Sequence, residues 1–278
     1  MRRNRKNVFA TMALLLLGVA CTNEKYEDFV GSNNTADKVS FFVEPLTRAG
    51  ETTFDTGDAI GVFASTTSDG TLNSTGNYAD NAKYAYASGS FIHTGSGIST
   101  PNLPGSTVTY YAVYPFAEQR TPQFSFTVNT DQTTYDAYTK SDLMLAKATA
   151  SASSQKVPLW FDHVMSRLLI DASALGLYQG TYSIEVICQK ATMDVNLQQQ
   201  TVESKSDVKR IKPCGDGDHH FKVILPPQTL NKANVTATLH INGKSASKSV
   251  IMYSSVDLRP GTSVELKLRE KNGEYYFY

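Results

Sequence analysis

Hydrophobic and polar residues alternate with a period of two wherever the pattern along this chain is regular. Apolar side chains occupy every second position in 124–128, 235–241 and 264–268. Successive side chains of a β-strand point to opposite faces, so this alternation predicts strands with one buried face. The segment Thr107–Tyr114 is apolar on both faces, which predicts a strand covered on both sides. We therefore expect an all-β protein.

Asn-Gly pairs mark tight turns between these strands, and one non-periodic stretch divides the strands into two groups of similar size. Asn242-Gly243 and Asn272-Gly273 supply residues that adopt the positive φ of tight hairpins. The small, polar stretch Ala148–Lys156 lacks periodicity and is typical of a domain linker or a long loop between strands. We predict two β-sandwich domains in tandem, over residues 38–155 and 156–278.

The N-terminus has the pattern of a secretory lipoprotein signal. Four basic residues within positions 2–6 precede the apolar run Val8–Ala20, which is too short for a membrane span and ends directly before Cys21. We expect a signal peptide at 1–20, cleavage before Cys21, lipidation of its thiol and a tether at 21–37. Gly18 departs from the usual leucine of such a site, and an ordinary signal peptide with an incidental cysteine is the alternative.

Charge and composition give no support for binding to nucleic acid. The whole chain has 26 basic and 26 acidic residues, and removal of residues 1–20 with their four basic residues leaves 22 against 26, a net charge of −4. No basic excess is available for phosphate backbones or anionic lipid. The cluster Glu24, Glu27 and Asp28 resembles a surface-export signal of Bacteroidetes lipoproteins, with a solvated tether as the alternative.

Two cysteines remain if Cys21 carries lipid. Cys188 and Cys214 form an even pair in an oxidising compartment, where a disulfide persists, and we treat them as a candidate disulfide. Against the disulfide, Cys188 is in phase with Tyr182, Ile184 and Val186 on the apolar face of a strand, which is typical of a buried free thiol.

No arrangement of residues predicts catalysis, a metal site or a cofactor. The five histidines are scattered, and His163 adjoins Asp162 without an assignable nucleophile. The cluster Asp216, Asp218, His219 and His220 lacks a repeating ligand spacing, so a polar hairpin turn explains it better than an ion site. A phosphate-binding glycine loop, a nucleophile elbow and a zinc-binding helix are all missing from the sequence.

Several segments, in this order and spacing, resemble the fimbrillin family of Bacteroidetes, specifically the Mfa-like fimbrillins and pilins of the type V pilus. The strongest combination is Thr47-Arg48-Ala49 followed by Phe54-Asp-Thr-Gly-Asp-Ala-Ile-Gly-Val-Phe-Ala64. Weaker matches extend the resemblance over most of the chain, and they are Val39–Val43, Tyr111–Pro115, Ser141–Ala146, Phe161–His163 with Arg167-Leu168, Leu225–Gln228 and Arg259–Thr262.

The resemblance implies two transthyretin-like antiparallel β-sandwich domains in an exported, lipid-anchored protein of the outer membrane and fimbrium. It also implies assembly with other fimbrial subunits, in which an arginine-specific protease removes the N-terminal strand and a strand of the next subunit fills the groove. Arg48 is the candidate cleavage site, and Val39–Val43 is the strand that would leave; an ordinary loop arginine is the alternative.

The C-terminus argues for an end position in such a fibre. Ser263–Arg269 continues directly from Pro260-Gly261 without a flexible spacer, so we expect it to close its own domain rather than to serve as a donor strand. A tip, anchor or accessory subunit is then favoured over a stalk pilin. The competing function on the same scaffold is a surface lipoprotein that binds a glycan or another ligand, with tyrosines such as Tyr78, Tyr84, Tyr86, Tyr135 and Tyr138 stacking on sugars.

Overall fold

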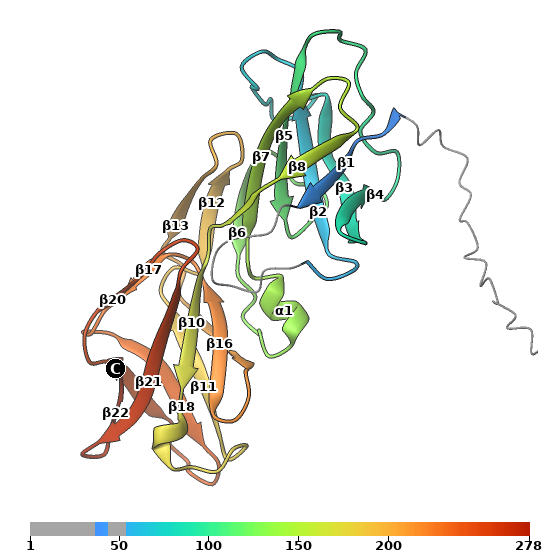
Figure 1. The fold of residues 1–278 in the computed structure, drawn as a ribbon. Coiled ribbons are helices and arrows are strands. Elements are labelled where there is room, and N and C mark those ends of the chain that lie inside the picture. The colour runs from blue at the N-terminus through green and yellow to red at the C-terminus, as the bar shows by residue number, and fades with distance from the viewer. Residues whose placement is uncertain (1–36, 44–53) are drawn as a thin grey trace, which may run out of the picture. The chain divides into compact units, whose positions relative to one another are not determined.

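The computed structural model describes residues 37–43 and 54–278, which lie in one compact unit (Figure 1). Within these ranges the chain is almost entirely β-strand, and its helical elements are α1 (Tyr135–Thr139) and a short 3-10 turn (Ser173–Leu175). Two large sheets curl into barrel or half-barrel shapes. The all-β prediction is confirmed.

The first sheet consists of eight strands among the described residues, in the order β8-β1-β4-β3-β2-β5-β7-β9. Every neighbouring pair is antiparallel except β1 with β8, which run parallel. These strands are β1 (Ser40–Val43), β2 (Ala59–Ser65), β3 (Ala79–Ala87), β4 (Ser90–His93), β5 (Thr107–Tyr114), β7 (Met144–Ser151), β8 (Lys156–Leu159) and β9 (Phe161–His163).

The second sheet consists of nine described strands in the order β14-β11-β18-β19-β22-β21-β10-β16-β15. Two of its pairs, β10 with β21 and β19 with β22, are parallel, so neither large sheet is purely antiparallel. These strands are β10 (Ser166–Asp171), β11 (Tyr182–Cys188), β14 (Lys209–Ile211), β15 (Cys214–Gly215), β16 (His220–Leu225), β18 (Val235–Ile241), β19 (Lys248–Met252), β21 (Ser263–Lys271) and β22 (Glu274–Phe277).

Two smaller sheets complete the fold. In one, β6 (Gln123–Thr127) pairs with β12 (Thr192–Asn196), which pairs with β13 (Thr201–Lys205); in the other, β17 (Gln228–Leu230) pairs with β20 (Val256–Leu258). Strand β6 comes from the first half of the sequence, whereas β12 and β13 come from the second. The three-stranded sheet therefore joins the two halves by backbone hydrogen bonds.

The three-stranded sheet explains why β5 is buried on both faces. Tyr110 and Ala112 belong to the hydrophobic core inside the first sheet, whereas Tyr111 and Val113 belong to a second core. That second core also contains Phe126 of β6 and Met193 of β12, and it continues into the second large sheet. The predicted two-sided coverage of Thr107–Tyr114 is confirmed, since the strand is buried from Val108 to Tyr114.

The stretch that resembled a linker is largely strand. β7 runs to Ser151, and β8 begins at Lys156, so only four residues connect the two strands. Both β8 and β9 lie in the first sheet, and the chain enters the second sheet only at Ser166. The change of sheet thus falls after the boundary predicted at 155/156, because the chain returns to add two more strands to the first sheet.

Of the two predicted tight hairpins, the one at Asn272-Gly273 is present, whereas Asn242-Gly243 begins a longer loop, 242–247, between β18 and β19 in which only Gly243 adopts positive φ. Asn272 and Gly273 adopt positive φ values of 57° and 82° and connect β21 to β22 in a two-residue turn. The polar cluster 216–219 is the turn between β15 and β16, closed by a hydrogen bond from the Asp216 amide to the His220 carbonyl at 2.9 Å. The predicted polar hairpin turn is therefore present.

Candidate functional site

The N-terminal strand β1 occupies a slot between β4 and β8 in the first sheet (Figure 1). Phe41 is opposite Phe91 of β4 on one side and Val157 of β8 on the other. Outside the ladder, the Val39 amide donates to the Ile98 carbonyl and the Ser40 amide to the Gln155 carbonyl, both at 2.8 Å. A strand that precedes the others in sequence thus completes a sheet made from later ones.

The inward face of β1 fills the first core. Val39 and Phe41 are fully buried, and the Phe41 ring meets the edges or faces of Tyr84 and Tyr110 in T-shaped contacts, with centroids 4.9 Å and 5.3 Å apart. Truncation of a buried phenylalanine to alanine costs about 3–5 kcal/mol. Removal of β1 would consequently expose both a hydrophobic pocket and the backbone groups of two neighbouring strands.

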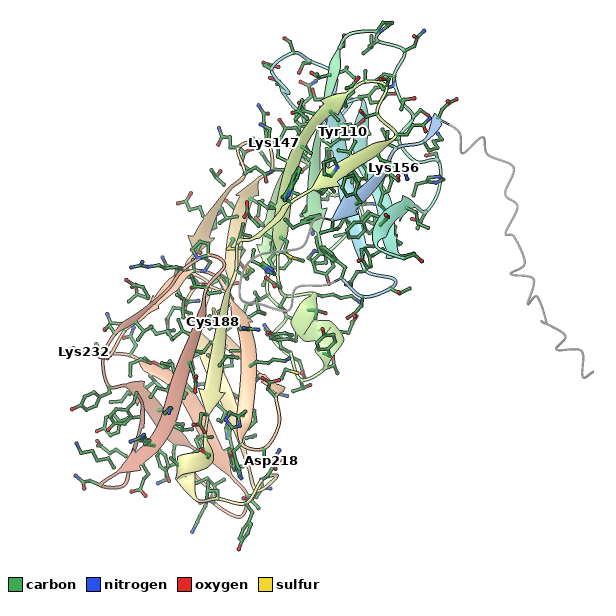
Figure 2. All side chains as sticks on the ribbon, in the orientation of Figure 1. Tyr110, Lys147, Lys156, Cys188, Asp218 and Lys232 are labelled. Carbon is green, nitrogen blue, oxygen red and sulfur yellow. The ribbon has the colours of Figure 1, made fainter. Side chains whose placement is uncertain are left out.

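Two tyrosine hydroxyls lie in the core under β1. The Tyr84 hydroxyl accepts a hydrogen bond from the Ile98 amide at 2.9 Å, and burial raises the pKa of Tyr84 to about 12. Tyr110, labelled in Figure 2, also has a buried hydroxyl. This hydroxyl has no hydrogen-bond partner among the described residues. Burial raises the pKa of Tyr110 above its ordinary value, and the neighbouring Tyr84 and Tyr78 raise it further.

The outward face beside the slot carries exposed hydrophobic side chains. Trp160 directly follows β8 and is 55% exposed, and Ile92 of β4 is 49% exposed. Between them lie the partly buried Phe42 and Pro158, which are paired across β1 and β8. Isolated apolar residues on a surface are ordinary, but these belong to the three adjacent strands at one end of a sheet.

Two residues singled out from the sequence, Cys21 and Arg48, lie outside the described residues. β1 ends at Val43, so Arg48 follows it by five positions in the sequence. The predicted strand Val39–Val43 and the observed strand Ser40–Val43 agree to within one residue.

In the structure no disulfide bond joins the two remaining cysteines, Cys188 and Cys214. Both are buried, and they lie on strands at opposite margins of the second sheet, β11 and β15. Cys188 Sγ accepts a hydrogen bond from Gln228 Nε2 at 3.0 Å. Burial raises the pKa of the Cys188 thiol, which keeps it protonated and unreactive at neutral pH.

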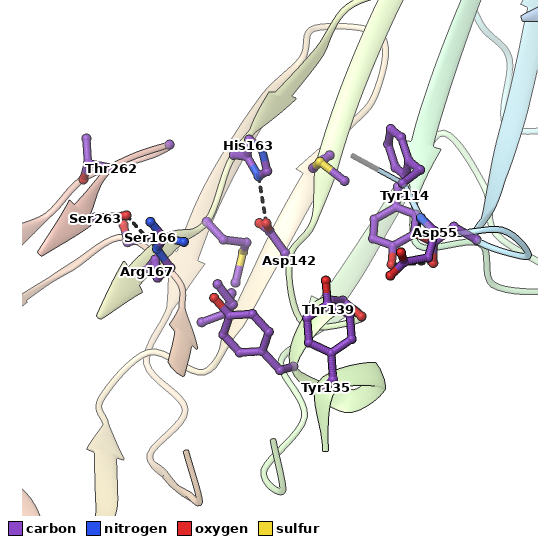
Figure 3. A pocket seen from close by; sticks show the side chains of 17 residues that line it. Asp55, Tyr114, Tyr135, Thr139, Asp142, His163, Ser166, Arg167, Thr262 and Ser263 are labelled. Atoms are coloured by element: carbon purple, nitrogen blue, oxygen red, sulfur yellow. Dashed lines mark hydrogen bonds and ion pairs between the residues drawn. The ribbon is translucent and has the colours of Figure 1, made fainter. Parts of the chain in front are cut away.

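A cavity of about 60 Å³ lies among α1, the end of β5 and the starts of β7 and β10 (Figure 3). Aromatic walls come from Tyr114 and Tyr135, and polar groups come from Asp142, His163 and Arg167. Arg167 Nε donates to Ser263 Oγ at 2.8 Å, and Tyr114 donates its hydroxyl proton to Asp58 at 3.1 Å. Burial raises the pKa of Asp58, which outweighs the opposite effect of its hydrogen bonds.

Asp142 and His163 form an ion pair at this cavity, with Oδ2 and Nδ1 2.7 Å apart. Burial by itself lowers the pKa of His163, but the hydrogen bond and charge of Asp142 outweigh burial and the pKa is raised. The Nε2 atom of His163 is buried and has no partner among the residues described. The sequence signalled His163 only by its acidic neighbour Asp162, whereas the actual partner lies 21 positions away.

The tyrosines considered for sugar stacking differ in exposure. Tyr84 and Tyr138 are buried and Tyr86 is partly buried, so these three are core or packing residues. Tyr78 and Tyr135 remain exposed, at 39% and 47%. Only Tyr135 of these five is both exposed and in the wall of the cavity.

Other chemistry is sparse in the described part of the chain. In residues 37–43 and 54–278, no group of three or more His, Cys, Asp or Glu side chains is placed to hold a metal ion. Among the same residues, no helix has the length and apolar character required to cross a membrane.

The described residues define a nearly all-β protein of two curled sheets, in which the first strand fills a slot between later strands. Residues 47–274 match the family model described as fimbrillin-like. The chain therefore belongs to the fimbrillin-like family. A comparison with curated proteins returns no match.

Solved structures from Bacteroides share this fold. A candidate cell adhesion protein from Bacteroides ovatus has a TM-score of 0.67 at 17% identity, with 87% of this chain and 95% of that one covered. One from Bacteroides uniformis has a TM-score of 0.63 at 20% identity, covering 86% and 96%. A third, from Bacteroides thetaiotaomicron, has a TM-score of 0.51 at 18% identity, covering 84% and 92%. At these identities the similarity establishes the fold and leaves the function to be argued.

Proposed function

We propose that this protein is a cell-surface fimbrial subunit, structural and adhesive rather than catalytic, that assembles with other subunits by β-strand exchange at the slot of β1. Membership of the fimbrillin-like family supports a fimbrial or adhesive role. The observation that carries the exchange mechanism is the position of β1, which pairs with a strand on each side and buries Val39 and Phe41 completely.

Strand exchange follows from the physics of that slot. Departure of β1 would leave β4 and β8 with unpaired N–H and C=O groups, which favour addition of another strand. Each buried polar group without a partner costs about 1–3 kcal/mol, in addition to the exposed hydrophobic pocket. An entering strand would pair these backbone groups again and would fill the hydrophobic pocket with alternate side chains in the places of Val39 and Phe41.

Cleavage after Arg48 would supply the trigger. Because β1 ends five residues earlier, that cut would separate β1 from the remaining strands while leaving every strand from β2 onward intact. β1 would then be held only by non-covalent contacts and could be displaced. We propose Arg48 as the site for an arginine-specific protease.

The C-terminal strands support an end or accessory position in the fibre. β21 and β22 lie in the interior of the second sheet, between β19 and β10, and Leu266 and Leu268 are buried in the core. A hairpin in this position closes its own sheet and is unsuited to act as a donor. We therefore propose a subunit that receives a strand, at a tip, anchor or accessory position, rather than a stalk pilin.

Lipidation of Cys21 would hold the protein at the outer membrane. Two or more acyl chains anchor a protein stably, because each buried CH₂ contributes about 0.8 kcal/mol. Labelling of cells with an alkyne palmitate analogue should tag the wild-type protein and not a Cys21→Ala variant. Equal labelling of the two would remove the anchor from this proposal.

Limited digestion with trypsin tests strand exchange. The first cut should fall after Arg48, as located by mass spectrometry, and an Arg48→Gln variant should resist it. After the cut, a fluorescent peptide with the sequence Asp37–Val43 should bind the wild-type protein and should not bind the uncut Arg48→Gln variant. A cut protein that keeps its own strand, stays monomeric and binds no peptide would contradict the mechanism.

The second candidate function is binding of a glycan or another small ligand. It is favoured by the cavity in Figure 3, where the exposed ring of Tyr135 adjoins the charged groups of Asp142, His163 and Arg167. Aromatic faces and convergent polar groups are the usual components of a ligand site. On a glycan array, the intact monomer should then give signals that Tyr135→Ala removes and Tyr178→Ala, on an 85% exposed ring outside the cavity, preserves.

A further inference from the structure

The hydroxyl of Tyr110 is a buried polar group that makes no hydrogen bond within the described residues. Its residue is fully buried, and the hydroxyl has no hydrogen-bond partner among residues 37–43 and 54–278. A phenylalanine would fill the same volume without an unpaired polar atom. Buried polar groups that lack a partner are rare in native proteins, and each one calls for an explanation.

The surroundings of Tyr110 point to the slot of β1. Its ring packs against Phe41, and the neighbouring hydroxyl of Tyr84 lies at Ile98, whose carbonyl accepts the hydrogen bond of the Val39 amide. Val39 directly before β1 and Phe41 within it are buried in the first core, Val43 packs against the same core, and all three side chains are hydrocarbons. Phe41 of β1 thus packs against the Tyr110 ring, and none of these hydrocarbon side chains can pair with the Tyr110 hydroxyl.

We propose that Tyr110 selects the strand that replaces β1, by pairing its hydroxyl with a hydrogen-bonding side chain at one of the two fully buried positions, those of Val39 and Phe41. The partner is therefore a β-strand of another subunit with Ser, Thr, Asn, Gln or His in the place of Val39 or Phe41. This inference rests on the proposed strand exchange. The slot then binds the entering strand more tightly than β1, because the entering strand makes the same backbone hydrogen bonds and one additional side-chain hydrogen bond.

Variants of the intact chain test the unpaired hydroxyl without any cleavage. Tyr110→Phe removes only the orphan group, so its melting temperature should equal or exceed that of the wild type. Tyr84→Phe is the matched control, since it removes the acceptor of the Ile98 amide and should lower the melting temperature. A clear destabilisation by Tyr110→Phe would show that the hydroxyl already has a partner and would overturn the proposal.

Peptide exchange tests the selection itself. After the cut at Arg48, labelled Asp37–Val43 peptides that carry Val39→Thr or Phe41→His compete with the unmodified peptide for the slot. At least one variant should bind about 3- to 10-fold more tightly to the protein with Tyr110, the value of one neutral hydrogen bond. The same peptide should bind Tyr110→Phe less tightly than the unmodified peptide does, because its polar group is then buried without a partner. A Ser40→Thr peptide, altered on the outward face, is the control and should show no preference.

The outcomes separate this inference from the function on which it rests. If the unmodified peptide does not bind the cut protein, strand exchange itself is wrong. If it binds and neither inward variant gains affinity, or if the gain persists in Tyr110→Phe, exchange stands and selection by Tyr110 is overturned.

Discussion

Two buried glutamine side chains connect segments that strands alone leave apart. Gln132 is fully buried and bonds the backbone of Ile224 twice, through Nε2 to its carbonyl and through Oε1 to its amide, both at 2.9 Å. Gln228 accepts from the amides of Gln189 and Lys190 and donates to Cys188 Sγ. Each amide group thereby takes the place of a neighbouring strand.

The ion pair between Asp142 and His163 makes stability depend on pH. Since the pKa of His163 is raised on folding, the pair stabilises the protein fully below the unfolded pKa of about 6.5, and this contribution is lost as the pH rises through the folded-state pKa. Arg167 opposes this shift and Asp162 adds to it.

We expect Asp142→Asn to remove that dependence. The difference in unfolding free energy between wild type and variant, from urea titrations, should be larger at pH 6 than at pH 8.5. NMR titration of His163 should give a pKa above 6.5 in the wild type and a lower one in the variant. A difference that is constant with pH would contradict this assignment.

Strand β21 lies in the interior of the second sheet, with a parallel neighbour on one side and an antiparallel neighbour on the other. It pairs parallel with β10 and antiparallel with β22, and β22 in turn pairs parallel with β19. Parallel neighbours require long connections, so the pairings of β21 with β10 and of β22 with β19 join segments that are separated in the sequence. The C-terminal hairpin thus closes the sheet.

Truncation of Leu266 tests whether β21 is structural. Leu266 is 2% exposed, so Leu266→Ala should destabilise the monomer by about 2–5 kcal/mol. Glu265→Ala, on the exposed face of the same strand, should change stability by less than about 0.5 kcal/mol. An unchanged melting temperature of Leu266→Ala together with lost assembly would instead identify β21 as a donor strand.

At the scale of the molecule, the two large sheets share a hydrophobic core. Phe63 and Tyr111 of the first sheet belong to the same cluster as Leu168 and Leu266 of the second. The pairing of β6 with β12 adds backbone hydrogen bonds between the two halves of the sequence. Separate unfolding of either sheet would expose this common core, so we expect one cooperative transition.

The single tryptophan offers a direct measurement of that coupling. Trp160 lies between β8 and β9 of the first sheet, whereas Leu266 lies in the second. Leu266→Ala should lower the unfolding midpoint followed by Trp160 fluorescence as much as the midpoint followed by circular dichroism. A Trp160 midpoint that does not move would mean that the two sheets unfold independently.

Local pattern predicted several strands and the last hairpin of this protein. Alternation identified β6, β18 and β21, apolar residues on both faces identified β5 as a covered strand, and Asn272-Gly273 identified the last hairpin. These features depend on side-chain periodicity and on positive φ, both of which are properties of adjacent residues. The strand at Val39–Val43, found as β1, was expected from the resemblance to the fimbrillin family and not from its pattern.

Tertiary structure decided which strands are neighbours. The parallel pairing of β1 with β8, the return of β8 and β9 to the first sheet and the pairing of β6 with β12 join residues that are far apart in sequence. The pairing of His163 with Asp142 and the lack of a partner for the Tyr110 hydroxyl among the described residues were likewise unpredictable, because packing and not the neighbours in the chain fixes what surrounds a polar group. The sequence by itself determined the strands and their buried faces, and only the fold determined the slot of β1, since a slot exists only between strands that long-range pairing has brought together.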